Sequence, residues 1–266
     1  MVDPSDFSTI DQSEDCSDIS HNPKFVSSVI DTKVTSTAID NCDLFLRSGV
    51  FDSEMHMINN EKMKLLTTDE RSSFIKKLEE SSAIVFDTET SALNGHVIQL
   101  AIVLIDSNKK EIGEYNKYLK LDKSIKIDKR AQQVHNISED VLNQMGVLPE
   151  EELLYIHLIF RICRYKHIQI FAHNALFDTR RLNETSQFYR LSDVLSVDDV
   201  VCTMKQSSIH CDLKDRNGKR KNPKCSELYF YLFGMEYNGV LHNAIEDTRM
   251  TARCVIEGSE RGYWNI

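Results

Sequence analysis

The sequence has no long hydrophobic run and no closely spaced cysteine pair, and each absence excludes a class of protein. No apolar stretch approaches the roughly 18 residues that a membrane-spanning helix needs, so neither a transmembrane protein nor a membrane partner is expected. The acidic first 18 residues lack an apolar stretch, so we expect no secretory signal there. The seven cysteines are scattered and odd in number, which favours free thiols in an intracellular compartment, either cytoplasmic or nuclear.

The net charge of −9 is confined to the N-terminal quarter of the chain. Residues 1–70 hold 14 acidic and 5 basic side chains, and the remaining 196 residues carry 27 of each sign. The acidity of the whole chain therefore says little about the larger part of the protein. A neutral domain can still bind phosphates through a local basic patch, or through metal ions held by its own carboxylates.

The composition divides the chain into two regions. Residues 1 to about 40 contain twelve Ser or Thr, no Gly and little periodicity, which is typical of disorder. Residues 41–65 contain short apolar pieces without a clear strand and could dock on the main domain. We predict an acidic, Ser/Thr-rich, mostly disordered extension over 1–65 and a folded domain over 66–266.

From Leu65 onward the hydrophobic pattern predicts an α/β domain. A helix capped near Thr68 runs to Glu80, and a buried strand follows at 83–87. Two further strands are then predicted, joined by a polar turn, at 97–105 and 112–119. The rest of the pattern predicts helices at 138–146, 150–165, 175–188, 224–233 and 244–258, short strands at 168–172 and 197–202, and a polar loop at about 205–222. This order is typical of a mixed sheet flanked by helices.

Four acidic residues stand at the ends of these predicted elements. Asp87 and Glu89 end the first strand and share one face, because strand side chains alternate. Asp178 and Asp247 lie early in two helices. A lone Asp after a strand is most often a cap or turn residue, but two carboxylates on one face repel unless a cation lies between them. Mg²⁺ prefers oxygen ligands, and two such ions about 3.5–4 Å apart can support phosphodiester displacement.

Three motifs, in this order, resemble those of the DEDDh 3′–5′ exonucleases. They are Phe-Asp-Thr-Glu-Thr at 86–90, His-Asn-Ala-Leu-Phe-Asp at 173–178 and His-Asn-Ala-Ile-Glu-Asp at 242–247. This DnaQ-like family includes the proofreading epsilon subunit, ribonuclease T and oligoribonuclease. The resemblance covers about residues 80–260. It implies a ribonuclease H-like α/β fold with a mixed five-stranded sheet flanked by helices.

The resemblance also implies the roles of five residues. Asp87, Glu89, Asp178 and Asp247 would hold two Mg²⁺ or Mn²⁺ ions, and His242 would be the general base that takes a proton from the attacking water. An imidazole with an ordinary pKa near 6.5 can accept a proton at neutral pH. The spacing of His242, five residues before Asp247, is that of the histidine branch rather than of its tyrosine-containing sister group.

A second set of residues is implied to contact substrate: Thr88, Thr90, Leu93, His135, Asn174 and Phe177. Leu93 would wedge against a base. Phe177 could stack on a base or fill an ordinary core position, and His135 could approach the substrate or be a buried, hydrogen-bonded histidine. Asn174 is also expected to cap its helix.

The chain departs from the family pattern at two places where glycine is common. Ala92 follows the first motif, and Asn136 lies in the Val-His-Asn-Ile segment at 134–137, which resembles the family's short His-Gly-Ile segment. Asn136 fits if its backbone reaches the left-handed region. All five positions implied to be catalytic are intact.

Several other features have alternative interpretations. The segment 214–224 contains six basic residues and could follow a phosphate backbone, resemble a nuclear import signal or be a solvated loop. Trp264 is expected on the domain surface, and two cysteines, Cys163 and Cys254, in the core. A zinc site would have to use residues whose spacing fits no usual pattern, namely Cys202, His210, Cys211 and Cys225.

The sequence therefore predicts a metal-dependent 3′–5′ exonuclease. It would act on the 3′ ends of single-stranded DNA, RNA or both and release nucleoside 5′-monophosphates, with a polymerase or a replication or repair protein as a possible partner. One alternative is a module on a nuclease fold that holds nucleic acid or a polymerase without cutting. Another is an interaction protein that works through its N-terminal segment. The intact acidic set favours the enzyme.

Overall fold

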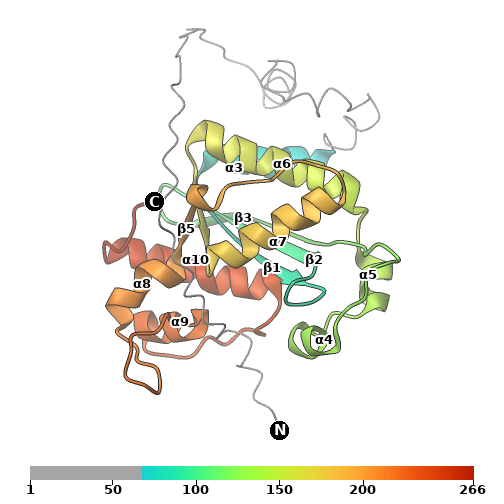
Figure 1. The fold of residues 1–266 in the computed structure, drawn as a ribbon. Helices are drawn as coiled ribbons and strands as arrows, with labels where there is room; N and C mark the ends of the chain where they lie inside the picture. The colour runs from blue at the N-terminus through green and yellow to red at the C-terminus, as the bar shows by residue number, and fades with distance from the viewer. Residues whose placement is uncertain (1–67) are drawn as a thin grey trace, which may run out of the picture. The chain divides into compact units, whose positions relative to one another are not determined.

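The computed structural model describes residues 68–266, which form a sheet covered by helices on both faces (Figure 1). The predicted acidic extension over 1–65, its disorder and its docking lie outside the described residues. The first helix, α3 (Asp69–Glu80), begins after Thr68, whose hydroxyl accepts a hydrogen bond from the Arg71 backbone N–H. None of the described helices is long and apolar enough to cross a membrane.

The sheet has five strands in the order β3-β2-β1-β4-β5. The strands are β1 (Ser81–Thr90), β2 (Val97–Asp106), β3 (Glu111–Tyr118), β4 (Gln169–Ala172) and β5 (Val200–Cys202). The first three pair antiparallel, whereas β4 pairs parallel with both β1 and β5. The predicted mixed sheet is confirmed. Strand β1 is longer than predicted, because its pairing with β2 continues to Thr90, so both acidic residues of the first motif lie within the strand.

The alternation of side chains along β1 assigns each face of the sheet to different helices. Phe86 packs against Phe160 of α6 (Pro149–Lys166), with ring centroids 5.2 Å apart. On the other face, Val85 belongs to a core cluster with residues of α9 (Cys225–Phe233) and α10 (Ala244–Glu260). Because the strand period is two, Asp87 and Glu89 continue the face that α10 covers.

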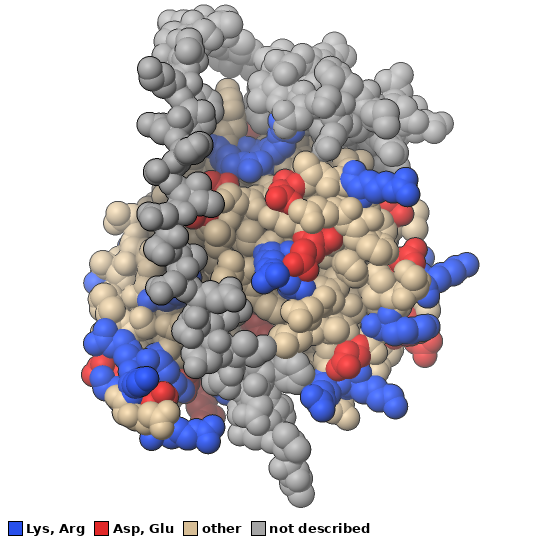
Figure 2. All heavy atoms as spheres, in the orientation of Figure 1, with Lys and Arg blue, Asp and Glu red and all other residues tan. Residues whose placement is uncertain are grey.

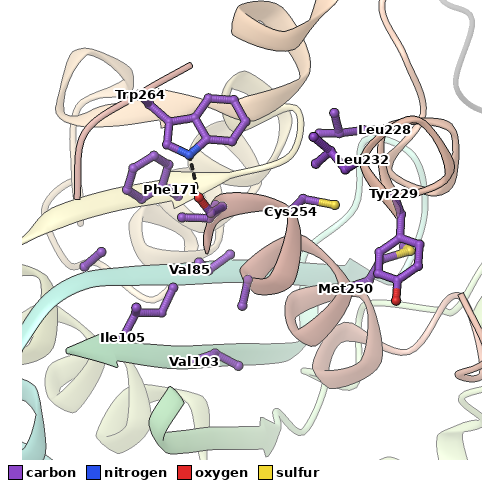
Figure 3. Close-up of a cluster of buried hydrophobic side chains, with 13 residues drawn as sticks. Val85, Val103, Ile105, Phe171, Leu228, Tyr229, Leu232, Met250, Cys254 and Trp264 are labelled. Atoms are coloured by element: carbon purple, nitrogen blue, oxygen red, sulfur yellow. Dashed lines mark hydrogen bonds between the residues drawn. The ribbon is translucent and has the colours of Figure 1, made fainter. Parts of the chain in front are cut away.

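Trp264 lies in this core cluster, so its predicted surface position is wrong (Figure 3). Only 7% of the residue is exposed, and its indole N–H donates to the Val255 carbonyl oxygen at 2.7 Å. The chain reverses after α10 at Gly262, whose φ is +74°, and this returns the ring onto the helix. A Cβ at Gly258 would lie 2.2 Å from a ring carbon of Trp264, so the close packing requires glycine there. Cys254 is buried in the same cluster, as predicted.

Two helices were not predicted from the sequence. The segment predicted as a polar loop at 205–222 begins inside α8 (Thr203–Cys211), which contradicts that prediction. The inward face of α8 carries Thr203 and Ser207, both fully buried, so no apolar stripe marks the helix. The short α4 (Lys129–His135) is likewise mostly polar. The remaining helices are α5 (Glu139–Met145), α7 (Ala175–Phe188) and the 3₁₀ turn η3 (Val197–Asp199).

Candidate active site

Three carboxylates meet between β1 and α10. Asp87 and Glu89 extend from adjacent same-face positions of β1, and Asp247 extends from the first turn of α10. One oxygen from each residue lies within 4.8 Å of the others, and no other group of three possible metal ligands forms within residues 68–266. Residues about 160 positions apart in sequence are thus brought to one point by the packing of α10 on the sheet.

A buried amide on β2 holds the start of α10 in place. Gln99 pairs with Glu89 in the sheet register and is fully buried. Its Oε1 accepts a hydrogen bond from the Ala244 backbone N–H at 3.2 Å, and its Nε2 donates to Asn243 Oδ1 at 3.2 Å and to Asn116 Oδ1 at 3.0 Å. The sequence interpretation missed Gln99. The signal was a polar residue inside the otherwise apolar strand Val97–Ile105.

His242 lies at the edge of the carboxylate cluster, immediately before α10. Its backbone is left-handed, with φ +62°, and its N–H donates to Asp247 Oδ2 at 3.0 Å. The loss of solvent around the imidazole and the positive charge of Lys224 lower the pKa of His242 below its ordinary value. The ring is therefore favoured in its neutral form, which can accept a proton.

Asp178 lies beside the cluster, at the start of α7, and is 2% exposed. Its Oδ1 accepts hydrogen bonds from the Thr88 backbone N–H at 3.1 Å and from the Thr88 hydroxyl at 2.8 Å. Thr88 thus orients the Asp178 carboxylate. The substrate contact that the resemblance implies for Thr88 stays a prediction. The negative charge of Asp178 raises the pKa of Asp87, so the two carboxylates interact even though Asp178 is not one of the three residues that converge.

The acidic side chains of the site strongly perturb one another. Burial raises the pKa of Asp87 well above its ordinary value, and the charges of Asp178 and Asp247 raise it further. Burial, followed by the same two charges, raises the pKa of Glu89 to about 8. Burial is also the main cause that raises the pKa of Asp178 and of Asp247 to about 7.

These shifts mean that the carboxylates cannot all ionise at neutral pH without a counter-charge. A divalent cation would supply that charge, and carboxylate oxygens are the ligands that Mg²⁺ and Mn²⁺ prefer. The residues present therefore fit the metal ions that the family resemblance implies.

The other residues implied to contact substrate differ in their burial. The Thr90 hydroxyl donates to the Ala92 carbonyl oxygen at 2.7 Å, and Thr90 is buried. Leu93 and Phe177 are half-buried, so each presents part of its side chain to solvent. Asn174 is exposed and is the N-cap residue of α7, as predicted, but its side chain makes no capping hydrogen bond. Its left-handed φ of 70° differs from the extended backbone that N-cap side chains normally need.

His135 is buried at the end of α4, with 6% exposure, and its Nδ1 accepts a hydrogen bond from the Ile137 backbone N–H at 3.0 Å. A buried, hydrogen-bonded histidine was one of the two interpretations. Burial of the ring is the main cause that lowers the pKa of His135 below its ordinary value. Asn136 has φ +57°, the left-handed backbone that its replacement of glycine required.

The residues considered for zinc do not form a ligand group. The ring of His210 stacks on Tyr263, with centroids 3.7 Å apart and planes 7° from parallel. Cys225 Sγ lies 3.1 Å from the Thr251 hydroxyl.

Comparison with known proteins identifies the family. Residues 84–255 match the model of the RNase_T exonuclease family, and this stretch is more than half of the chain. The chain belongs to this exonuclease family. The DnaQ-like family and ribonuclease H-like fold predicted from the motifs are thereby confirmed. No curated protein matches the sequence.

Solved structures with the same fold share little sequence with this chain. E. coli exonuclease I in complex with a dA16 oligonucleotide is 15% identical, with a TM-score of 0.54 over 68% of this chain and 41% of its own. A full-length 3′-exonuclease is also 15% identical, with a TM-score of 0.53 over 68% and 82% of the two chains. A 3′-exonuclease described as recognising the histone mRNA stem-loop is 14% identical, with the same TM-score and coverage. At these identities the similarity establishes the fold.

Proposed function

We propose that this protein is a metal-dependent 3′–5′ exonuclease that hydrolyses phosphodiester bonds at the 3′ end of single-stranded DNA, RNA or both and releases nucleoside 5′-monophosphates. The observation that carries the proposal is the convergence of Asp87, Glu89 and Asp247 within 4.8 Å, with raised pKa values and with His242 beside them. A protein that only binds nucleic acid has no need to concentrate acidic side chains where phosphates must approach.

The acidic residues would hold two Mg²⁺ or Mn²⁺ ions. Asp87, at the centre of the group, would contribute to both ions, Glu89 and Asp247 would complete one site, and Asp178 would complete the other. Bound ions of this kind stabilise the attacking and leaving oxygens of a phosphodiester displacement. Thr88 keeps the Asp178 carboxylate in a fixed orientation through its two hydrogen bonds.

His242 would take the proton from the attacking water. Its lowered pKa keeps the imidazole neutral near pH 7, the state that a general base needs. The hydrogen bond from its backbone to Asp247 fixes the histidine relative to the carboxylates.

The half-buried Leu93 and Phe177 are suited to contact the terminal base, because each offers partly exposed apolar surface and lies close in sequence to an acidic residue of the site. We propose further substrate contacts from Thr90, His135 and Asn174. Neighbours of the same fold support nucleic acid as the ligand, since exonuclease I is described with a dA16 oligonucleotide and another neighbour with an mRNA stem-loop. A polymerase or repair partner stays a prediction.

The proposal is tested with 5′-labelled single strands of DNA and RNA of equal sequence, incubated with Mg²⁺, Mn²⁺ or EDTA. We expect a ladder that shortens from the 3′ end with either metal and is absent in EDTA and in Asp87→Asn. The matched control is Asp140→Asn, which neutralises an exposed carboxylate on α5. Retained binding of uncut strands under every metal condition would support the non-cleaving module instead.

A further inference from the structure

Two segments of the folded domain together hold 11 of the 27 Lys and Arg side chains of residues 71–266. Residues 212–224 carry six Lys or Arg and two Asp, a net charge of +4, and residues 120–130 carry five and two, a net charge of +3. Since residues 71–266 are neutral as a whole, the rest of that part of the chain carries −7. Figure 2 shows Lys and Arg side chains gathered where Figure 1 places the segment between α8 and α9.

The first segment is a small hairpin, which we call the basic hairpin (212–224). Lys214 and Arg220 pair across it, the Asp215 N–H donates to the Lys219 carbonyl oxygen at 2.7 Å, and Gly218 turns the chain with φ +77°. A defined hairpin, rather than an unstructured loop, therefore presents these cations.

Two of the six cations of the basic hairpin are available to a ligand. Asp212 pairs with Lys214 and with Arg220, and Lys221 pairs with Glu227. Within residues 68–266, the exposed Arg216 and Lys219 form no ion pair.

The base of the basic hairpin is joined to the candidate active site. The ring of His173 hydrogen-bonds the Pro223 carbonyl oxygen through Nε2 and contacts the Thr203 hydroxyl through Nδ1, each at 3.0 Å. His173 is the first residue of the second motif. The end of the hairpin is thus anchored to the segment that leads into α7, which carries Asp178.

The second segment, 120–130, adjoins another edge of the site. The Asp128 N–H donates to the carbonyl oxygen of Ser91, which directly follows the first motif, at 2.7 Å. The segment leads into α4, which ends at the buried His135. In Figure 1, the basic hairpin lies at the lower left, below α8 and α9, and α4 lies at the lower right, so the two segments lie on different sides of that view.

We infer that the basic hairpin and segment 120–130 form a phosphate-binding track for a single strand that extends several nucleotides from the site. The inference rests on the proposed function for its assignment of nucleic acid as the ligand. A cluster of carboxylates repels a polyanion, and cations on its flanks supply the attraction that guides the strand in. The track predicts that the protein binds strands of many nucleotides more tightly than dinucleotides and trinucleotides, which carry too few phosphates to occupy the site and the track together.

The test uses the full chain and the double variant Arg216→Gln/Lys219→Gln. The matched control is Lys76→Gln/Lys110→Gln, which removes two exposed lysines from α3 and the β2–β3 turn. Binding of a 5′-fluorescein 20-nucleotide single strand and of a labelled trinucleotide is followed by fluorescence anisotropy in EDTA, so that no cleavage is needed. Salt is varied between about 0.1 and 1 M, because each contact to a single-strand phosphate contributes about −0.7 to the slope of log affinity against log salt.

Loss of two phosphate contacts should lower the magnitude of the slope of log affinity against log salt by about 1.4 for the 20-nucleotide strand. The Kd of this strand should then rise about 25-fold at about 0.1 M salt. Trinucleotide binding and the control variant should not change. The inference would be overturned if the double variant bound the 20-nucleotide strand with unchanged affinity. It would also be overturned if the double variant lost as much affinity for the trinucleotide, or for a 20-base-pair duplex, as for the single strand. An absence of cleavage in the labelled-strand assay would refute the proposed nuclease and leave this binding result readable by itself.

Discussion

Replacing Gln99 by Met tests whether one buried amide positions two elements of the site. Methionine has a similar length and flexibility but offers only a weak acceptor and no donor. In Gln99→Met the Ala244 N–H loses its acceptor in a fully buried setting, and Asn243 loses a donor. Asn116 is exposed and can bond to water instead.

The expected loss of stability follows from these contacts. An orphaned buried N–H costs about 1–3 kcal/mol and a lost hydrogen bond about 1 kcal/mol, so we expect a free energy of unfolding lower by about 2–4 kcal/mol. For a domain of this size each kcal/mol lowers Tm by about 2–4 °C, which gives a fall of about 4–16 °C. The start of α10 also carries His242 and Asp247, and a displacement of about 1 Å there would lower kcat on the order of 100-fold.

The measurements are thermal unfolding and the rate of strand shortening at saturating substrate, each for Gln99→Met and Gln99→Glu. Glu keeps an acceptor for the Ala244 N–H but adds a negative charge next to Glu89. We therefore expect Gln99→Glu to need a higher Mg²⁺ concentration or a lower pH to be as stable as the unmodified protein. Gln99→Met should be less stable than the unmodified protein at every pH. A Met variant with an unchanged Tm and unchanged kcat would refute the reasoning.

Three further predictions concern stability. Gly258→Ala places a Cβ 2.2 Å from a carbon of Trp264 and should lower the free energy of urea unfolding by about 1–3 kcal/mol; an unchanged midpoint would contradict the packing. Glu152→Ala removes the buried carboxylate whose Oε2 lies 2.7 Å from Arg71 Nη2, and it should lower the free energy of unfolding by about 2–4 kcal/mol. The loss is smaller than for a fully buried ion pair because Arg71 is partly exposed. In EDTA, carboxylates with raised pKa values, such as Glu89 at about 8, bind more protons folded than unfolded, so stability should fall from about pH 4 to about pH 8. Mg²⁺ should then raise Tm more at pH 8 than at pH 5.5, and an equal rise at both would argue against a site at these carboxylates.

Local sequence patterns predicted the strands and the shared face of the first motif. Asp87 and Glu89 alternate with Thr88, and the strand period alone places both carboxylates on one side. The same patterns missed α8, because its buried face consists of Thr203 and Ser207 rather than apolar side chains. They also misplaced Trp264, because its burial depends on how the chain reverses after α10.

The amino-acid sequence by itself predicted the order of the strands, the family and the acidic residues of the candidate site, since each prediction rests on residues near one another in the chain. Only the tertiary structure brought Asp247 within 4.8 Å of Asp87 and Glu89, through the hydrogen bonds of Gln99 to the start of α10. It also joined the basic hairpin to the site through His173 and Pro223. These contacts link segments from about 50 to about 160 residues apart, and their geometry depends on packing that no local pattern encodes.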